Sequence, residues 1–202
     1  MAPTPERIVL ASASAARAAL LRSAGIEFSI EPAAIDEAPL KQEMRTAGRL
    51  ATACALALAV EKARYVSKRH RDALVIGADQ MLTLGTEWFD KPVDLEEART
   101  QLCKLRGGSH ALATAACVVR AGETVWSGTS VPELTMRRFS DSFLDGYIAA
   151  EGESLLGSVG AYRLEGRGVQ LFSRVGGDHF VILGLPLIEL LEFLRQRGAL
   201  PR

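Results

Sequence analysis

Short apolar runs alternate with amphipathic stretches along the chain, and this pattern predicts strands interleaved with helices. Residues 7–12 (RIVLAS) and 73–84 (ALVIGADQMLTL) are apolar and partly β-branched, which is typical of buried strands. Residues 26–32 (IEFSIEP) predict a further strand between them. We expect the run over 73–84 to enter a turn near residues 77–79 and to find a hairpin partner near residues 87–89.

Helix signals fill the gaps between these strands. Ser14 is a good N-cap for a helix that runs to about Ala24, and Gly25 is a suitable stop. Further helices are predicted over residues 47–68, over 95–105 behind a capping box of Asp94 and Glu97, over 141–150 behind Ser140, and over 187–198 behind Pro186.

The middle of the chain indicates antiparallel pairing. Residues 111–122 and 123–139 predict a long β-hairpin, residues 168–175 a last strand, and residues 33–40 (AAIDEAPL) a loop. Because hairpins occur beside strand–helix alternation, the predicted fold class is α/β, with a mixed twisted sheet and flanking helices.

Composition narrows the class of protein. The 202 residues are 48% hydrophobic and 24% charged, which suits a single domain over residues 1–202. Lysine plus arginine equals aspartate plus glutamate at 24 each, so no overall basic field attracts a nucleic acid polymer. The three separate cysteines and the lack of a long apolar run predict a cytoplasmic protein that does not enter a membrane.

The first candidate binding site lies at the start of the first helix. Arg17 falls in the first helical turn, where the helix dipole disfavours a cation by about 0.3–1 kcal/mol. A phosphate would remove that penalty, because free helix N–H groups, the hydroxyls of Ser12 and Ser14, and the Arg17 guanidinium would all bind it. The alternative is a solvent-facing arginine on an ordinary amphipathic helix.

Two further candidates are charged residues beside apolar runs. Lys62 continues the helical face of Cys54 and Leu58, so its ammonium either enters a cleft or extends along the surface to water. Asp79 follows a buried strand, where an acid either belongs to a functional site or caps a local turn. Lys91 precedes Pro92, which restricts its backbone to extended conformations.

Common catalytic motifs are missing from the sequence. It contains no phosphate-binding loop of the GxxxxGK[ST] type, no GxGxxG after a strand, no GxSxG and no HExxH. One aspartate with several cations and no dedicated nucleophile indicates that water attacks a phosphoryl group with the help of a metal.

Seven short motifs occur in an order and spacing that resemble the Maf family of nucleoside triphosphate pyrophosphatases. They are LASASAAR, IDE, EKA, IGADQ, KP, VGAYRLEGRG and LGLPL, and they extend from about Ile8 to Arg197. The resemblance implies a fold like that of the inosine triphosphate pyrophosphatases, with two lobes flanking a cleft. It also implies cleavage between the α and β phosphates, dependence on Mg²⁺ or Mn²⁺, a cytoplasmic location and a possible homodimer.

The resemblance also implies roles for individual residues. The family's phosphate-binding serine and arginine correspond to Ser12 and Arg17. Its acid corresponds to Glu37, its two lysines correspond to Lys62 and Lys91, and its proton acceptor corresponds to Asp79. We expect Asp79 and Glu37 to hold the metal, while the cations neutralise the phosphates and the pyrophosphate that leaves.

The sequence departs from the family pattern, and these departures bear on the base. Ala18 replaces a second arginine, and Asp90 replaces the glycine before Lys91. Gln80 and Glu165 resemble the branch that cleaves 7-methyl-GTP rather than dTTP and UTP. A carboxylate at position 165 would accept the N1–H and N2–H donors of guanine.

Two other functions remain open at the level of sequence. The missing second arginine is compatible with a nucleotide-sensing regulator of septum formation that has little turnover. A phosphatase that releases single phosphates is the other alternative, although the chain offers no pair of aspartates for an aspartyl nucleophile. The products distinguish all three functions.

Overall fold

The computed structural model describes residues 6–201, which form two compact units. The first unit comprises residues 6–80, 114–130 and 178–201, and the second comprises 81–113 and 131–177. Strands β3 (Leu74–Leu84) and β5 (Ser109–Arg120) each contribute residues to both units. The predicted single domain over 1–202 stays a prediction. Within residues 6–201, no helix is both long and apolar enough to cross a membrane.

The first unit is built on a sheet with a parallel centre. Strand β1 (Ile8–Leu10) pairs in parallel with both β2 (Ser29–Ile30) and β3. Strand β5 follows β3 in the sheet and pairs antiparallel with β6 (Glu123–Ser130). The helices of this unit are α1 (Ala15–Ser23), α2 (Ala38–Thr46), α3 (Ala51–Ser67), α6 (His179–Ile182) and α7 (Leu187–Gln196).

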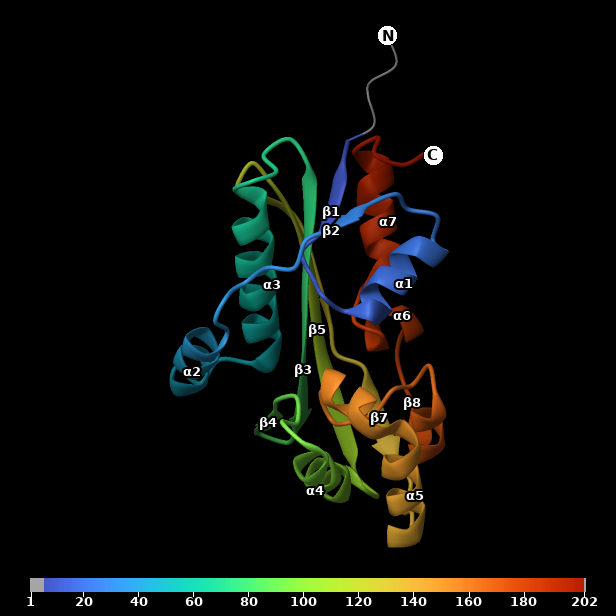
Figure 1. Ribbon diagram of the computed structural model, residues 1–202. Coiled ribbons are helices and arrows are strands. Elements are labelled where there is room, and N and C mark those ends of the chain that lie inside the picture. The colour runs from blue at the N-terminus through green and yellow to red at the C-terminus, as the bar shows by residue number, and fades with distance from the viewer. Residues whose placement is uncertain (1–5, 202) are drawn as a thin grey trace. The chain divides into compact units, whose positions relative to one another are not determined.

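The two faces of this sheet carry separate cores. Alternate residues of a strand point to opposite faces, so Leu10 and Ile76 pack in one core with residues of α1 and α7, while Val9 and Val75 pack in another with residues of α3. Figure 1 shows α3 on one side of β1 and β3, and α1 and α7 on the other. By the same alternation, consecutive side chains near the end of the part of β3 that belongs to this unit point to opposite faces of the sheet.

Strand β3 continues through the position of the predicted turn. Gly77 is a strand residue, and it is not among the glycines with a positive φ, so the prediction of a turn at 77–79 is wrong. A Cβ added at Gly77 would lie 2.1 Å from the carbonyl oxygen of Ala59 and 2.8 Å from the Cβ of Ala63. The glycine therefore lets α3 pack closely against the strand.

The second unit is antiparallel in its pairing. Strand β4 (Glu87–Phe89) pairs with the end of β3, and β7 (Glu133–Met136) pairs with both β5 and β8 (Phe172–Val175). Its helical elements are α4 (Leu95–Leu105), α5 (Asp141–Glu151), and the 3₁₀ helices η1 (Gly152–Gly157) and η2 (Arg167–Leu171). The mixed α/β class predicted from the sequence is confirmed.

Caps decide several of the helix boundaries. The side chains of Ser14 and Ser140 cap α1 and α5 as predicted. Asp94 caps α4 by accepting from the Glu97 N–H at 2.7 Å, whereas the Glu97 carboxylate reaches the Val93 N–H rather than that of Asp94. The capping box is therefore confirmed in position but displaced by one residue in its second bond.

Three regions differ from the pattern-based prediction. Helix α2 begins inside the predicted loop over 33–40. It has no buried residue, so no apolar periodicity in the sequence indicates a helix there. The predicted strand over 168–175 is strand only in β8, because η2 occupies its first part. The predicted hairpin forms between β5 and β6, but β7 is a separate strand after Pro132.

Candidate functional site

The start of α1 is organised by its two serines. Ser14 has extended backbone dihedral angles and its hydroxyl accepts from the Arg17 N–H at 3.4 Å, which ends the strand-like segment and starts the helix. The hydroxyl of Ser12 accepts from the Ser14 N–H at 3.2 Å. This places the Arg17 side chain in the first turn, as the sequence predicted.

The Arg17 guanidinium links three separate parts of the first unit. Its Nη1 donates to the Ser12 hydroxyl at 3.1 Å and to the Ala78 carbonyl at 3.0 Å, and its Nε donates to the Gly184 carbonyl at 3.0 Å. Among the described residues Nη2 has no hydrogen-bond partner, so it is the nitrogen that an incoming anion would meet. Arg17 is thus a tethered cation and not the solvent-facing residue of the alternative interpretation.

The Ala78 carbonyl is available to Arg17 because β1 stops early. The last strand-like bond from β1 is the Ala11 N–H to the Ile76 carbonyl at 2.8 Å, and β3 continues beyond it. Beyond that bond, the Arg17 guanidinium donates to the backbone of β3 where a residue of β1 no longer does. A site at the carboxyl end of a parallel strand is the usual position for ligands in open α/β sheets.

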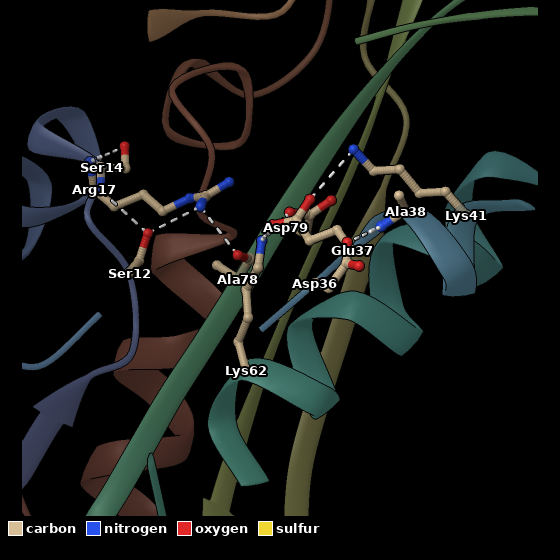
Figure 2. A network of polar contacts seen from close by, with 10 residues as sticks. All are labelled: Ser12, Ser14, Arg17, Asp36, Glu37, Ala38, Lys41, Lys62, Ala78 and Asp79. Atoms are coloured by element: carbon tan, nitrogen blue, oxygen red, sulfur yellow. Dashed lines mark hydrogen bonds and ion pairs between the residues drawn. The ribbon is translucent and has the colours of Figure 1, made fainter. Parts of the chain in front are cut away.

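Burial and nearby acids act in opposite directions on Arg17. Desolvation lowers the pKa of Arg17 below its usual value, while the negative charges of Asp79 and Glu37 raise it again in part. A guanidinium is effectively always protonated in proteins, so Arg17 remains a cation at neutral pH. Figure 2 shows the guanidinium directed toward the region of Asp79.

Lys62 joins the two predicted acids. Its Nζ lies 2.5 Å from Asp79 Oδ1 and 2.7 Å from Glu37 Oε1, and its side chain is only 13% exposed (Figure 2). The lysine therefore does not extend to water. Asp79 meets it because odd-numbered residues of β3 face α3, on the opposite face from Ala78 and Gln80.

Glu37 contacts Lys62 from the N-cap position of α2. The Asp36 carboxylate accepts from the Ala38 N–H at 3.1 Å at the start of α2, and the Glu37 carboxylate contacts Lys41 and Lys62. Burial raises the pKa of Glu37, but the hydrogen bond and charge of Lys62, with those of Lys41, outweigh it and lower the pKa overall. Glu37 is therefore ionised at neutral pH.

The acids fit a divalent ion that arrives with its own ligands. Within residues 6–201 no group of three or more histidine, cysteine or acidic residues is placed to hold a metal. Mg²⁺, however, is commonly bound by one or two carboxylates together with water and substrate phosphates. Asp79 and Glu37 supply such a pair, and the Lys62 ammonium contacts both.

Gln80 does not accompany Asp79. It points to the other face of the sheet, where its Nε2 donates to the Thr114 hydroxyl at 2.7 Å and to the carbonyls of Val181 and Ile182 at 3.2 and 3.1 Å. Its donor nitrogen is therefore already used by the first unit itself.

Lys91 and Glu165 belong to the second unit, so their place beside Asp79 stays a prediction. Lys91 is exposed in the segment after β4, next to the buried Pro92. Glu165 is also exposed, and its Oε1 lies 3.4 Å from Arg163 Nε.

Sequence reasoning missed several residues of the site. Lys41 contacts Glu37 at 3.2 Å, and the spacing of four residues on a helix was the available signal. Thr114 and Gly184 left no signal, because they join the site only through strand order and a distant turn. Ala18, where the family pattern has an arginine, is buried in the core beside Leu21.

Comparison with known proteins places these residues in a family context. The family model for Maf-like protein matches residues 7–197. A protein from Granulibacter bethesdensis named nucleoside triphosphate pyrophosphatase is 52% identical over 194 residues, covering 96% of this chain and 98% of that protein.

Two other relatives are similar over nearly their full length. One with the same name from Paramagnetospirillum magneticum is 52% identical over 192 residues, covering 95% of this chain and 99% of its own. A protein from Rhizobium meliloti named 7-methyl-GTP pyrophosphatase is 48% identical over 193 residues, covering 96% of this chain and 97% of its own.

Proposed function

Because the chain belongs to the Maf family, we propose that it hydrolyses a nucleoside triphosphate to the monophosphate and pyrophosphate. The observation that carries this proposal is the cluster in which Lys62 joins Asp79 and Glu37, with the tethered Arg17 directed toward it. Such a cluster supplies both cations for phosphates and carboxylates for a metal and a proton. The biological role would be the removal of non-standard nucleotides.

Each site residue that lies in the first unit has a chemical task in the proposed reaction. Water attacks the α phosphorus, its proton passes to Asp79, and the bond to the β phosphate breaks to release pyrophosphate. Arg17 Nη2 binds a phosphate oxygen, while Ser12 and the start of α1 fix the phosphate chain. Lys62 compensates the charge of Asp79 and Glu37 until phosphates bind, and can then donate to an oxygen.

A divalent metal ion, Mg²⁺ or Mn²⁺, is part of the proposal. Bound by Asp79 and Glu37, it would polarise the phosphoryl oxygens and lower the pKa of water. Lys91 of the second unit is proposed as a further phosphate-binding cation. A cytoplasmic location and a homodimer are also proposed, as the family resemblance implies.

We propose that the base is a guanine, and in particular 7-methylguanine. Relatives named 7-methyl-GTP pyrophosphatase support this, as does the carboxylate of Glu165. A 7-methylguanine ring carries a positive charge, which attracts a carboxylate in addition to hydrogen bonding. Ion pairing of Glu165 with Arg163 would have to give way to the base.

Glu165→Gln tests the choice of base. We expect kcat/KM for 7-methyl-GTP to fall about 10–150-fold, and that for UTP or dTTP to change little, because a charged hydrogen bond is worth roughly 1.5–3 kcal/mol. Glu153→Gln, an exposed glutamate of η1, is the matched control. Equal losses for all bases would show that Glu165 does not read the base.

Product analysis tests the reaction itself. Phosphorus NMR of wild-type protein with Mg²⁺ or Mn²⁺ and a panel of triphosphates should show pyrophosphate and monophosphate in equal amounts. Release of inorganic phosphate alone would indicate a phosphatase instead. Nucleotide binding without product would indicate the sensing regulator, an alternative that the relatives, named for a pyrophosphatase activity, do not favour.

A further inference from the structure

Two acids and two lysines of the first unit form a chain of alternating charge. Lys62 Nζ contacts Asp79 Oδ1 at 2.5 Å and Glu37 Oε1 at 2.7 Å, and the other oxygen of Glu37 lies 3.2 Å from Lys41 Nζ. The inner side chains, Asp79 and Lys62, are 10% and 13% exposed, whereas the outer ones, Glu37 and Lys41, are 33% and 23% exposed. The chain therefore leads from the interior toward the surface, and Lys41 is its outermost cation.

Lys41 is more shielded from water than a residue of an ordinary ion pair within a helix. In α7, Arg195 and Glu192 are 43% and 60% exposed, and the nitrogen and oxygen lie 3.7 Å apart. The Lys41 side chain instead extends from α2 to the Glu37 carboxylate (Figure 2). An isolated pair at this spacing contributes little free energy, so stability alone does not account for the placement of Lys41.

Helix α2 carries Lys41 without contributing to a core. None of its residues is buried, and it begins directly after Glu37. Lys41 lies one helical turn further on, so the two side chains share a face of the helix. Because this helix buries no apolar surface, its clearest link to the rest of the unit is the contact of Glu37 with Lys62. The placement of α2 thus brings a second lysine to the site.

Substrate binding would change the partners of both lysines. In the free protein, two carboxylates and two ammonium groups balance each other in charge. A divalent ion on Asp79 and Glu37 would compete for the carboxylate oxygens that Lys62 and Lys41 contact. A triphosphate carries more negative charge than one such ion neutralises, so phosphate oxygens would become the better partners for the ammonium groups.

We propose that Lys41 is a further substrate-binding residue, whose ammonium leaves Glu37 to bind the β and γ phosphates that depart as pyrophosphate. Its part in the reaction rests on the proposed function, in which Asp79 accepts the proton of the water that attacks the α phosphorus. Lys62 and Glu37 separate Lys41 from Asp79, so Lys41 meets the phosphates beyond the α position. There it neutralises the charge that grows on the leaving pyrophosphate.

Pyrophosphate alone tests this binding role without turnover. Calorimetry with inorganic pyrophosphate and Mg²⁺ should show an affinity about fivefold to 30-fold lower in Lys41→Met, which keeps the length of the side chain but removes its charge. A nucleoside monophosphate offers only the α phosphate, so it should bind to Lys41→Met as tightly as to wild type. Lys41→Arg keeps a cation and should restore most of the affinity for pyrophosphate.

Lys68→Met is the matched control. Lys68 is an exposed lysine of the same unit, at the end of α3. Its loss removes one positive charge outside the chain of alternating charge, so pyrophosphate affinity should stay within about twofold of wild type. Because α2 has no buried residue, the variants at position 41 should unfold at nearly the same temperature as wild type.

Kinetics on the panel of triphosphates complete the test. In Lys41→Met, kcat/KM should fall about fivefold to 30-fold for every base, mainly through KM, because the phosphates are common to all substrates. A loss confined to one base would overturn the proposal. An equal loss of affinity for monophosphate and pyrophosphate would also overturn it, because Lys41 would then act on the site as a whole.

The binding measurements also separate this proposal from the proposed function. If Lys41→Met weakened the binding of Mn²⁺ alone and left pyrophosphate affinity unchanged, Lys41 would only position Glu37, and the proposal would be wrong. It would be equally wrong if wild-type protein did not bind pyrophosphate. If wild-type protein cleaved no triphosphate, the proposed function would fail, whereas a pyrophosphate affinity that depends on Lys41 would still support Lys41 as a phosphate-binding residue.

Discussion

Both units of the molecule have ion pairs at the surface, but among the described residues only the first unit has a pair in which both side chains are largely buried. In the first unit, Lys62 and Asp79 form a pair whose side chains are only 13% and 10% exposed. In the second unit, the pairs lie at the surface, as in Lys104 with Glu87, where the side chains are 49% and 50% exposed. Desolvated charges cost free energy and exposed pairs contribute little to it, so the buried pair indicates function and the exposed pairs do not.

The units also differ in their buried polar groups. The second unit buries a neutral pair, in which His110 Nε2 and the Tyr162 hydroxyl lie 2.8 Å apart in contact with the Phe172 ring. The first unit instead buries Asp79 in contact with the Lys62 ammonium. Substitution of the buried Asp79 in the first unit should therefore affect catalysis, whereas substitution of the buried His110 in the second unit should affect stability alone.

The largest effect is expected from Asp79→Asn. The change keeps the shape of the side chain but removes the proton acceptor and one negative charge beside Lys62, so kcat should fall by at least about 10²-fold. Nucleotide binding, measured by calorimetry, should survive because Arg17 and Lys62 remain. Asp145→Asn in the second unit is the control, and activity within a few-fold of wild type for Asp79→Asn would remove Asp79 from the mechanism.

The next largest effect is expected on stability when Arg17 is replaced. The helix dipole alone predicts that removal of this cation leaves stability unchanged or slightly raised. The structure reverses that expectation, because Arg17→Ala leaves the carbonyls of Ala78 and Gly184 without their donor. We expect a loss of about 2–3 kcal/mol in the free energy of unfolding, together with weaker triphosphate binding.

Two variants sharpen this second prediction. Arg17→Lys keeps the charge but cannot make the three divergent bonds, so most of the stability loss should remain. Arg22→Lys, in the last turn of the same helix, should change stability by less than about 0.5 kcal/mol. Chemical denaturation measures both, and a stable Arg17→Ala protein would mean that the three bonds contribute little.

Local signals in the sequence predicted the fold best. The serine N-caps, Asp94, and the strand around Val75 gave elements in the right places, because caps and strand periodicity act over a few residues. Helix α2 was missed because it buries nothing. The glycine at position 77 was read as a turn because sequence alone does not distinguish φ > 0 from close packing against α3.

The site could be predicted residue by residue but not in its contacts. Arg17, Lys62 and Asp79 were all identified, because a charge beside an apolar run is visible in the sequence. The contacts of Lys62 with Asp79 and Glu37, and the opposite direction of Gln80, could not be seen in the sequence. They depend on parity, that is, on whether a position is odd or even along a β3 strand that is not interrupted. The predicted turn at Gly77 concealed that parity.

A moderate effect of pH is expected from His110 in the second unit. Burial lowers the pKa of His110 from 6.5 to about 4. Between these two pH values the unfolded chain binds a proton that the folded protein does not bind. A depressed histidine pKa means that stability falls as pH falls from about 6.5 toward 4 and is fully present above 6.5. The shift corresponds to about 2 kcal/mol lost between pH 7 and pH 5.

His110→Gln tests this assignment. Glutamine offers a polar group to Tyr162 but does not titrate, so the fall in unfolding free energy between pH 7 and pH 5 should shrink by about 2 kcal/mol. The exposed His179 provides the control variant His179→Gln. Denaturant titrations at several pH values measure the effect, and an unchanged pH profile would show that His110 is not the group responsible.

The smallest effect is expected at the surface pair of Arg99 and Asp145 in the second unit. The two side chains are 37% and 64% exposed, so water screens their attraction and little free energy is gained by holding them together. Asp145→Asn should change the unfolding free energy by less than about 0.5 kcal/mol, and that change should shrink further at 1 M salt. If thermal unfolding instead showed a loss near 2 kcal/mol, the exposed pairs of the second unit would contribute to the fold as the buried pair contributes to the site, and the contrast between the two units would not hold.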